Sequence, residues 1–164
     1  MFVLARLAAI SLVLASLAIA PALAVPHAGD VAPPFSLARV TGGGTLSLAQ
    51  LRGKATYVNF FASWCPPCNA EAPAIARLYR KYRSRGLTIV GIDELEDKGK
   101  AKDFASHYKW PFAVVLDDSG NTGRDYGALV LPIQVFIDKR GNVSTYRFGP
   151  MSPAEVDEAV RKIL

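Results

Sequence analysis

Short apolar runs alternate with amphipathic segments along most of the chain. Residues 55–62 (ATYVNFFA), 87–93 (LTIVGID) and 112–117 (FAVVLD) are rich in β-branched and aromatic residues, which is typical of buried strands. From Pro66 onward the apolar residues recur at helical spacing until Gly86, a residue that commonly ends helices. The pattern therefore predicts a strand, a helix of about five turns and a second strand, with the third strand further along the chain.

The rest of the chain adds two helices and a hairpin. Residues 98–109 predict a polar helix between the second and third strands, and residues 132–138 and 143–149 flank the turn DKRGN and predict a β-hairpin. The final segment, SPAEVDEAVRKIL, begins with Ser152 as N-cap of a capping box. This order of elements predicts an α/β fold with one mixed central sheet flanked by helices.

The N-terminal part of the chain has two regions of different composition. Residues 1–24 contain a single charge, Arg6, then an apolar stretch, Pro21 and the small-residue pattern ALA, which predicts a secretory signal peptide. The alternative is an uncleaved anchor, because the apolar stretch approaches the ~20 residues that span a bilayer. In residues 25–54, a GGG turn between FSLARV and TLSL predicts a short β-hairpin ahead of the main domain, so residues 25–164 are expected to form the folded domain.

Composition and charge narrow the class of protein. The chain has 164 residues of which 51% are apolar, enough for one compact domain with a core. Without Arg6, the 19 basic residues become 18 against 14 acidic ones, a net charge of +4 for residues 25–164. Five of the basic residues follow one predicted helix as a solvated face, so no nucleic-acid partner is expected: Arg77, Arg80, Lys81, Arg83 and Arg85.

Both cysteines of the chain lie in the segment FFASWCPPCNAEAP, between the first strand and the first helix. Cys65 is expected to be the N-cap of this helix, where free N–H groups and the helix dipole favour a thiolate. Pro66 and Pro67 suit the first helical turn and leave Cys68 and Asn69 as the nearest N–H donors. We therefore expect Cys65 to be an exposed nucleophile and Cys68 to be a buried resolving thiol.

The two thiols have four candidate uses. Structural zinc requires four ligands, and the remaining candidates are the distant His27 and His107. A structural staple across so short a loop would restrict the unfolded chain little. A copper chaperone would need a further ligand, for which only His107 or Met151 is available in residues 25–164. A redox couple is the favoured interpretation, with no metal expected.

The segment FFASWCPPCNAEAP resembles the active-site pattern N-F-W-A-S-W-C-x-P-C-x-x-E-x-P of the extracytoplasmic thioredoxin-like proteins of the TlpA/ResA/DsbE group. The resemblance covers residues 29–164 and includes GDVAPPFSLARV, IVGID and VLPIQVFIDKRGNV. It implies a thioredoxin-like fold with an N-terminal β-hairpin extension, thiol:disulfide oxidoreductase activity, and no cofactor apart from a redox-active disulfide.

The resemblance also assigns roles to individual residues. It implies that Cys65 attacks the substrate, that Cys68 is the buried cysteine with which it forms a disulfide, and that Trp64 shields the pair. It further implies that the bond between Leu131 and Pro132 is cis and lies against the disulfide, with the backbone available to pair with an extended substrate.

Two further positions bear on proton transfer. Glu71 follows Cys68 by three residues and so lies on the same face of the helix one turn on. The resemblance implies a partly buried carboxyl that tunes the cysteines and handles the proton of Cys68, whereas the simpler alternative is a first-turn acid favoured by the helix dipole. Asn59 stands where cytoplasmic thioredoxins have a buried aspartate, which gives Glu71 more weight.

The sequence departs from its relatives at one place. The DsbE subgroup often has an acidic residue after the cis-proline, where this chain has Ile133 and Gln134. An acidic stretch from Asp93 to Asp97 follows the second strand, and we interpret it as a polar strand-to-helix loop.

The expected function is an enzyme that reduces protein disulfides outside the cytoplasm, as in cytochrome c maturation. Its partners would be disulfide-containing proteins, such as apocytochrome c, and a membrane thiol electron donor. The alternatives are an oxidant that introduces disulfides and a copper or other metal chaperone. The expected location is the periplasm or the exterior, with membrane anchoring by residues 1–24 as the alternative. The direction of electron transfer does not follow from the sequence.

Overall fold

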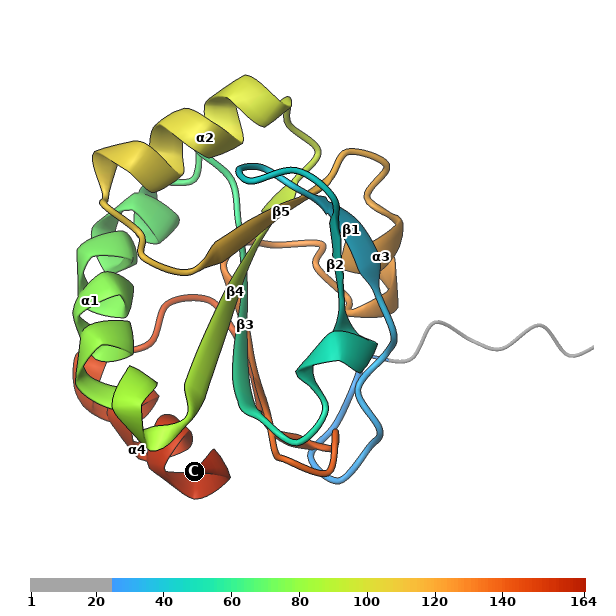
Figure 1. Ribbon diagram of the computed structural model, residues 1–164, viewed down its shortest axis with the longest axis vertical. Helices are drawn as coiled ribbons and strands as arrows, with labels where there is room; N and C mark the ends of the chain where they lie inside the picture. Colours follow the sequence, from blue (N-terminus) through green and yellow to red (C-terminus); the bar gives the residue numbers. More distant parts are fainter. Residues whose placement is uncertain (1–24) are drawn as a thin grey trace, which may run out of the picture.

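The computed structural model describes residues 25–164, which form one central sheet with helices on both faces (Figure 1). The predicted signal peptide or anchor, residues 1–24, lies outside the described residues. Within residues 25–164, none of the helices is both long and apolar enough to cross a membrane.

The sheet has seven strands in the order β2-β1-β5-β4-β3-β6-β7. The strands are β1 (Ser36–Arg39), β2 (Thr45–Ser47), β3 (Ala55–Phe61), β4 (Leu87–Glu94), β5 (Ala113–Asp117), β6 (Ile133–Ile137) and β7 (Val143–Phe148). Strands β3, β4 and β5 are parallel, whereas β6 is antiparallel to β3 and β7, and β1 is antiparallel to β2 and β5. The sheet is therefore mixed, as predicted, and β1 and β2 form the predicted hairpin at its edge.

Within residues 25–164, four α-helices accompany the sheet: α1 (Pro66–Tyr82), α2 (Lys98–His107), α3 (Asn121–Asp125) and α4 (Pro153–Ile163). Helices α1, α2 and α4 contribute to the apolar cluster on one face, where Tyr57 and Phe61 of β3 also lie (Figure 1). Val58 and Phe60 of the same strand belong to the cluster on the other face, with Tyr126 beside α3. All seven residues of β3 are buried because both faces are covered.

The predicted strands and helices match the structure to within a few residues, except for one helix. Helix α1 ends at Tyr82, a 3₁₀ turn follows, and Gly86 has the left-handed φ of 96° that a helix end favours. The short helix α3 was not predicted, because NTGRD is polar and too short to show periodicity. Helix α3 is stabilised by a contact with β5, since the side chain of Asp117 accepts a hydrogen bond from the Gly123 N–H at 2.8 Å.

The structure corrects the sequence interpretation of the acidic stretch from Asp93 to Asp97. Asp93 and Glu94 belong to the strand itself and are 0% and 4% exposed, so they are not part of a polar loop. Only the residues beyond them leave the sheet, and Asp97 is the N-cap of α2, accepting from the Lys100 N–H at 3.0 Å. The predicted strand, residues 87–93, ends one residue before β4 does, and the loop interpretation of Asp93 and Glu94 was wrong because hydropathy alone does not reveal that acidic residues are buried in a strand.

Burial changes the titration of both carboxyl groups. Burial and the charge of Glu96 raise the pKa of Asp93 to about 8. Burial and the neighbouring Asp117 raise the pKa of Glu94 to about 8, and its carboxyl lies so close to Gly123 that a Cβ there would collide with it. The folded protein therefore holds protons on these groups at a pH where an unfolded chain would have lost them.

We predict that Glu94→Gln makes stability less dependent on pH. Between the usual carboxyl pKa of about 4.3 and the raised value of Glu94, folding binds a proton, so the free energy of unfolding falls as pH rises. The neutral amide removes this term, so at pH 8 the variant should be about 4 kcal/mol more stable relative to the parent than at pH 4. Urea denaturation at both pH values measures the difference. The exposed Glu158→Gln is the control, and equal pH dependence in parent and Glu94→Gln would contradict the prediction.

Candidate active site

The junction between β3 and α1 places both cysteines at the start of a helix. Cys65 is the N-cap of α1, as predicted, and its Sγ accepts a hydrogen bond from the Cys68 N–H at 3.3 Å. Pro66 and Pro67 occupy the first positions of the helix, and the Asn69 N–H donates to the Cys65 carbonyl at 3.1 Å. The N–H of Cys68, in the first turn of the helix, therefore donates to the sulfur of Cys65.

Cys65 and Cys68 form a disulfide, with their Cα atoms 5.3 Å apart. The two residues are 2% and 3% exposed, so the expectation of an exposed Cys65 is wrong for this oxidised form. Its side chain packs into the same apolar cluster as Cys68, against which Leu131 also packs. The disulfide thus lies at the edge of the core.

Exposed apolar side chains precede both Cys65 and the bond between Leu131 and Pro132. Trp64, to which the resemblance assigns the role of shielding the pair, is 67% exposed. Leu129 and Val130 are also exposed, just ahead of the bond between Leu131 and Pro132. This bond is cis, as the resemblance implied.

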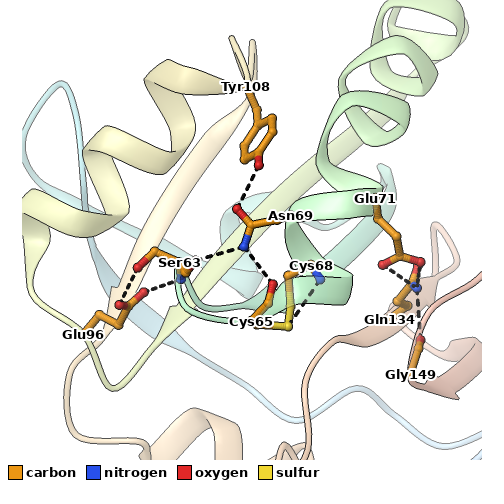
Figure 2. The surroundings of a disulfide bond; sticks show 9 residues. All are labelled: Ser63, Cys65, Cys68, Asn69, Glu71, Glu96, Tyr108, Gln134 and Gly149. Atoms are coloured by element: carbon orange, nitrogen blue, oxygen red, sulfur yellow. Dashed lines mark hydrogen bonds between the residues drawn. A yellow bond between two sulfur atoms is a disulfide. The ribbon is translucent and has the colours of Figure 1, made fainter.

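A hydrogen-bond network holds the loop that carries the cysteines (Figure 2). The carboxylate of Glu96 accepts from the N–H and the Oγ of Ser63 at 2.5 and 2.7 Å. The side-chain NH₂ of Asn69 donates to the carbonyls of Ser63 and Cys65 at 2.9 and 2.8 Å, and the Tyr108 hydroxyl donates to Asn69 Oδ1 at 2.8 Å. Residues from α1, α2 and the loop after β4 therefore fix the loop's shape.

Glu71 reaches away from the disulfide into a second network (Figure 2). Its Oε1 accepts from the Met151 N–H at 2.5 Å and from Gln134 Nε2 at 3.0 Å. Burial raises the pKa of Glu71, while the hydrogen bonds from Met151 and Gln134 act to lower it. Glu71 lies beyond the first turn of α1, so the alternative of a first-turn dipole acid does not describe it.

Gln134 links Glu71 to the sheet. Its Nε2 also donates to the Gly149 carbonyl at 3.2 Å, and its Oε1 accepts from the Tyr57 hydroxyl at 2.7 Å. Burial and the charge of Glu71 raise the pKa of Tyr57 well above its usual value, so the hydroxyl keeps its proton and acts as donor. Asn59, opposite Gln134 in the β3–β6 register, is buried, and its Nδ2 has no hydrogen-bond partner among the described residues.

Sequence reasoning found the cysteines and Glu71 but missed most of their partners. Ser63, Asn69, Glu96 and Tyr108 gave no signal, because the Ser63–Glu96 and Asn69–Tyr108 bonds join residues 33 and 39 positions apart. Gln134 was noticed only as a departure from the relatives. Within residues 25–164, no cluster of three or more His, Cys, Asp or Glu side chains is arranged to hold a metal ion.

Comparison with known proteins places this geometry among redox enzymes. The model of the AhpC/TSA family matches residues 28–146. The thiol-disulfide oxidoreductase ResA of Bacillus thuringiensis subsp. konkukian (strain 97-27) is 33% identical over 135 residues, which cover 82% of this chain and 78% of the relative.

Solved structures agree with this relationship. A putative thiol:disulfide interchange protein DsbE from Chlorobium tepidum has a TM-score of 0.78 at 28% identity, over 84% of this chain and 98% of that one. A secreted Mycobacterium tuberculosis disulfide oxidoreductase homologous to E. coli DsbE has a TM-score of 0.70 at 29% identity, over 78% of this chain and 95% of that one. The similarity in fold is thus accompanied by similarity in sequence.

We predict that Tyr108→Phe loosens the active-site loop. The change removes the hydroxyl that donates to Asn69, so the oxidised protein should lose about 1 kcal/mol of free energy of unfolding, measured by denaturant titration. Tyr79→Phe is the matched control, because Tyr79 is also partly buried but its hydroxyl makes no hydrogen bond within residues 25–164. Equal stabilities of the two variants would show that the Asn69 contact does not hold the loop.

Proposed function

Because the chain belongs to the AhpC/TSA family and, within it, to the TlpA/ResA/DsbE group of thiol-disulfide oxidoreductases, we propose that it reduces disulfides of protein substrates outside the cytoplasm. The observation that carries the proposal is the Cys65–Cys68 disulfide at the N-terminus of α1, in a chain whose Leu131–Pro132 bond is cis. The enzyme class follows from family membership, and the direction and location are the proposal.

The reaction consists of two thiol–disulfide exchanges. In the reduced enzyme the Cys65 thiolate attacks one sulfur of a substrate disulfide, the substrate S–S bond breaks, and the leaving thiolate takes up a proton. The Cys68 thiolate then attacks Cys65 Sγ and releases the second substrate thiol, so two electrons pass to the substrate and Cys65–Cys68 becomes a disulfide. The Cys68 N–H, 3.3 Å from Cys65 Sγ, and the helix N-terminus support the first thiolate.

Glu71 is the proposed proton acceptor for Cys68. Cys68 must lose its proton before it can attack, and it is 3% exposed, so bulk water reaches it poorly. Glu71 lies three residues further along α1, and burial raises the pKa of its carboxyl above the ordinary value, which makes the carboxylate a better proton acceptor. Asn59 has no titratable group and cannot accept the proton of Cys68, so Glu71 is the proposed acceptor.

The substrate surface proposed here comprises exposed apolar side chains that precede the two key segments, Trp64 before Cys65 and Leu129 and Val130 ahead of the bond between Leu131 and Pro132. An extended segment of a substrate would pair with the backbone beside Pro132, and apocytochrome c is one candidate substrate by resemblance. Reduction of the resulting Cys65–Cys68 disulfide would come from a membrane thiol electron donor. No cofactor beyond the disulfide is proposed.

The proposed location rests on residues 1–24, whose apolar stretch and ALA pattern favour export or anchoring. The Mycobacterium tuberculosis relative is described as secreted, which agrees with export. A reductant in an oxidising compartment needs a dedicated source of electrons, so this location and the proposed membrane donor belong together.

We predict that Cys68→Ala traps a mixed disulfide with substrate. Without the resolving thiol the first exchange proceeds and the second cannot, so a covalent adduct through Cys65 should accumulate when the reduced variant is mixed with a disulfide-containing protein. Non-reducing electrophoresis and mass spectrometry detect it. Cys65→Ala is the matched control and should form at least about tenfold less adduct, because Cys68 lies inside the helix and lacks the N-cap position and the N–H contact that support a thiolate at Cys65. Trapping by Cys65→Ala alone would reverse the two assignments.

We predict a reduction potential for the Cys65/Cys68 couple near or below that of thioredoxin, about −270 mV, at pH 7. Equilibration with a thiol buffer, followed by alkylation of free thiols, measures it. A value near that of a strong periplasmic oxidant, about −120 mV, would make the protein a donor of disulfides instead, with the enzyme class unchanged.

A further inference from the structure

Gln134 is a fully buried amide in contact with the proposed proton acceptor. It lies in β6, two residues after Pro132, and is 0% exposed. Strand β6 runs between β3 and β7, so the side chain of Gln134 can reach groups on both neighbours and on α1. It contacts Tyr57 of β3, Glu71 of α1 and Gly149 after β7 (Figure 2).

The partners of Gln134 allow the amide only one orientation. Its oxygen accepts from a hydroxyl, the 2.7 Å bond from Tyr57, whereas its nitrogen faces two acceptors, the Glu71 carboxylate and the Gly149 carbonyl. A flipped amide would set its oxygen against both acceptors, whereas the Tyr57 hydroxyl can donate or accept. The Glu71 carboxylate and the Gly149 carbonyl therefore fix the orientation of the amide, and the bond from Tyr57 holds its oxygen on the opposite side.

The N–H groups act on the charge of Glu71. Nε2 lies 3.0 and 3.3 Å from the two carboxylate oxygens, so a single N–H is shared between them, and the Met151 N–H adds a third contact at 2.5 Å. Hydrogen bonds of this kind stabilise the carboxylate, against the effect of burial. These hydrogen bonds therefore offset part of the rise in the pKa of Glu71 that burial causes.

A cavity gives this carboxyl access to water. Its volume is about 180 Å³, and it lies between α1 and α4 with Glu71 and Gln134 in its lining. The charged groups that line it are Arg77 and Lys81 of α1 and Asp157 of α4. The groups of the sheet on this side are neutral, because Tyr57 keeps its proton and Asn59 cannot ionise.

We propose that Gln134 is a positioning residue for proton transfer, which holds the Glu71 carboxyl in one orientation and stabilises its charged form while Tyr57 holds Gln134. The inference rests on the proposed function, in which Glu71 accepts the proton of Cys68. It gives a purpose to a buried amide at this position, since a carboxyl there would repel the charge of Glu71.

The test is Gln134→Met, which keeps the length of the side chain and removes its donors. The carboxyl of Glu71, followed by ¹³C NMR of glutamate-labelled oxidised protein and assigned by its loss in Glu71→Gln, should titrate about one pH unit higher than in the parent. The pH profile for release of the mixed disulfide by Cys68 should move in the same direction. Tyr57→Phe keeps both N–H donors and should shift the titration less.

A variant that keeps an acceptor for Tyr57 covers the case in which Gln134→Met does not fold. Gln134→Glu has nearly the same shape and exchanges the donor for a second carboxyl, so proton uptake near Glu71 should move to still higher pH. Denaturant titration of each variant separates this effect from a general loss of stability, which by itself moves neither titration nor pH profile.

The outcomes for the two proposals are separable. If Glu71→Gln leaves the pH profile of mixed-disulfide release unchanged, the role of Glu71 in the proposed function is wrong. If Glu71→Gln changes the profile, but the Glu71 titration in the folded Gln134 variants coincides with that of the parent, the inference about Gln134 is overturned. A raised titration together with a shifted profile supports both.

Discussion

The contact on which the site depends is the hydrogen bond from the Cys68 N–H to Cys65 Sγ at the first turn of α1. It exists because the central strand β3 ends where α1 begins, and because Pro66 and Pro67 remove the competing donors ahead of Cys68. The same N–H and the helix dipole would act on a thiolate at Cys65. The chemistry of the pair therefore follows from where the helix starts, which is why several elements hold that junction.

Two polar networks support the junction from opposite sides. Ser63 is held by Glu96 and Asn69 beneath the loop, and Glu71 is held by Gln134 and Met151 beyond the first turn. Most of their polar atoms have hydrogen-bond partners, as buried polar groups require. The first network fixes the position of the nucleophile, and the second regulates the charge proposed to activate its partner.

The carboxyl groups near the active-site end of the sheet show how burial controls charge. Asp93 and Glu94 both have a pKa raised to about 8, since each is buried beside another acid. Glu71 is also raised, but it receives N–H donors and has a neutral Asn59 on the strand side. The difference in donors, rather than in residue type, separates carboxyls that stay protonated from one that can ionise.

Features that depend on neighbours in the chain were predictable from the sequence. They are the order of strands and helices, the cap at Cys65, the capping box at Ser152 and the redox use of a C-x-x-C pair. These features follow from local periodicity and capping, whereas the cis bond before Pro132 was implied only by resemblance. Tertiary structure decided the burial of Cys65, the burial of Glu94 within β4 and the contact of Gln134 with Glu71. The physical reason is distance along the chain: Gln134 meets Glu71 across 63 residues, and no local pattern records which side chains the folded sheet brings together.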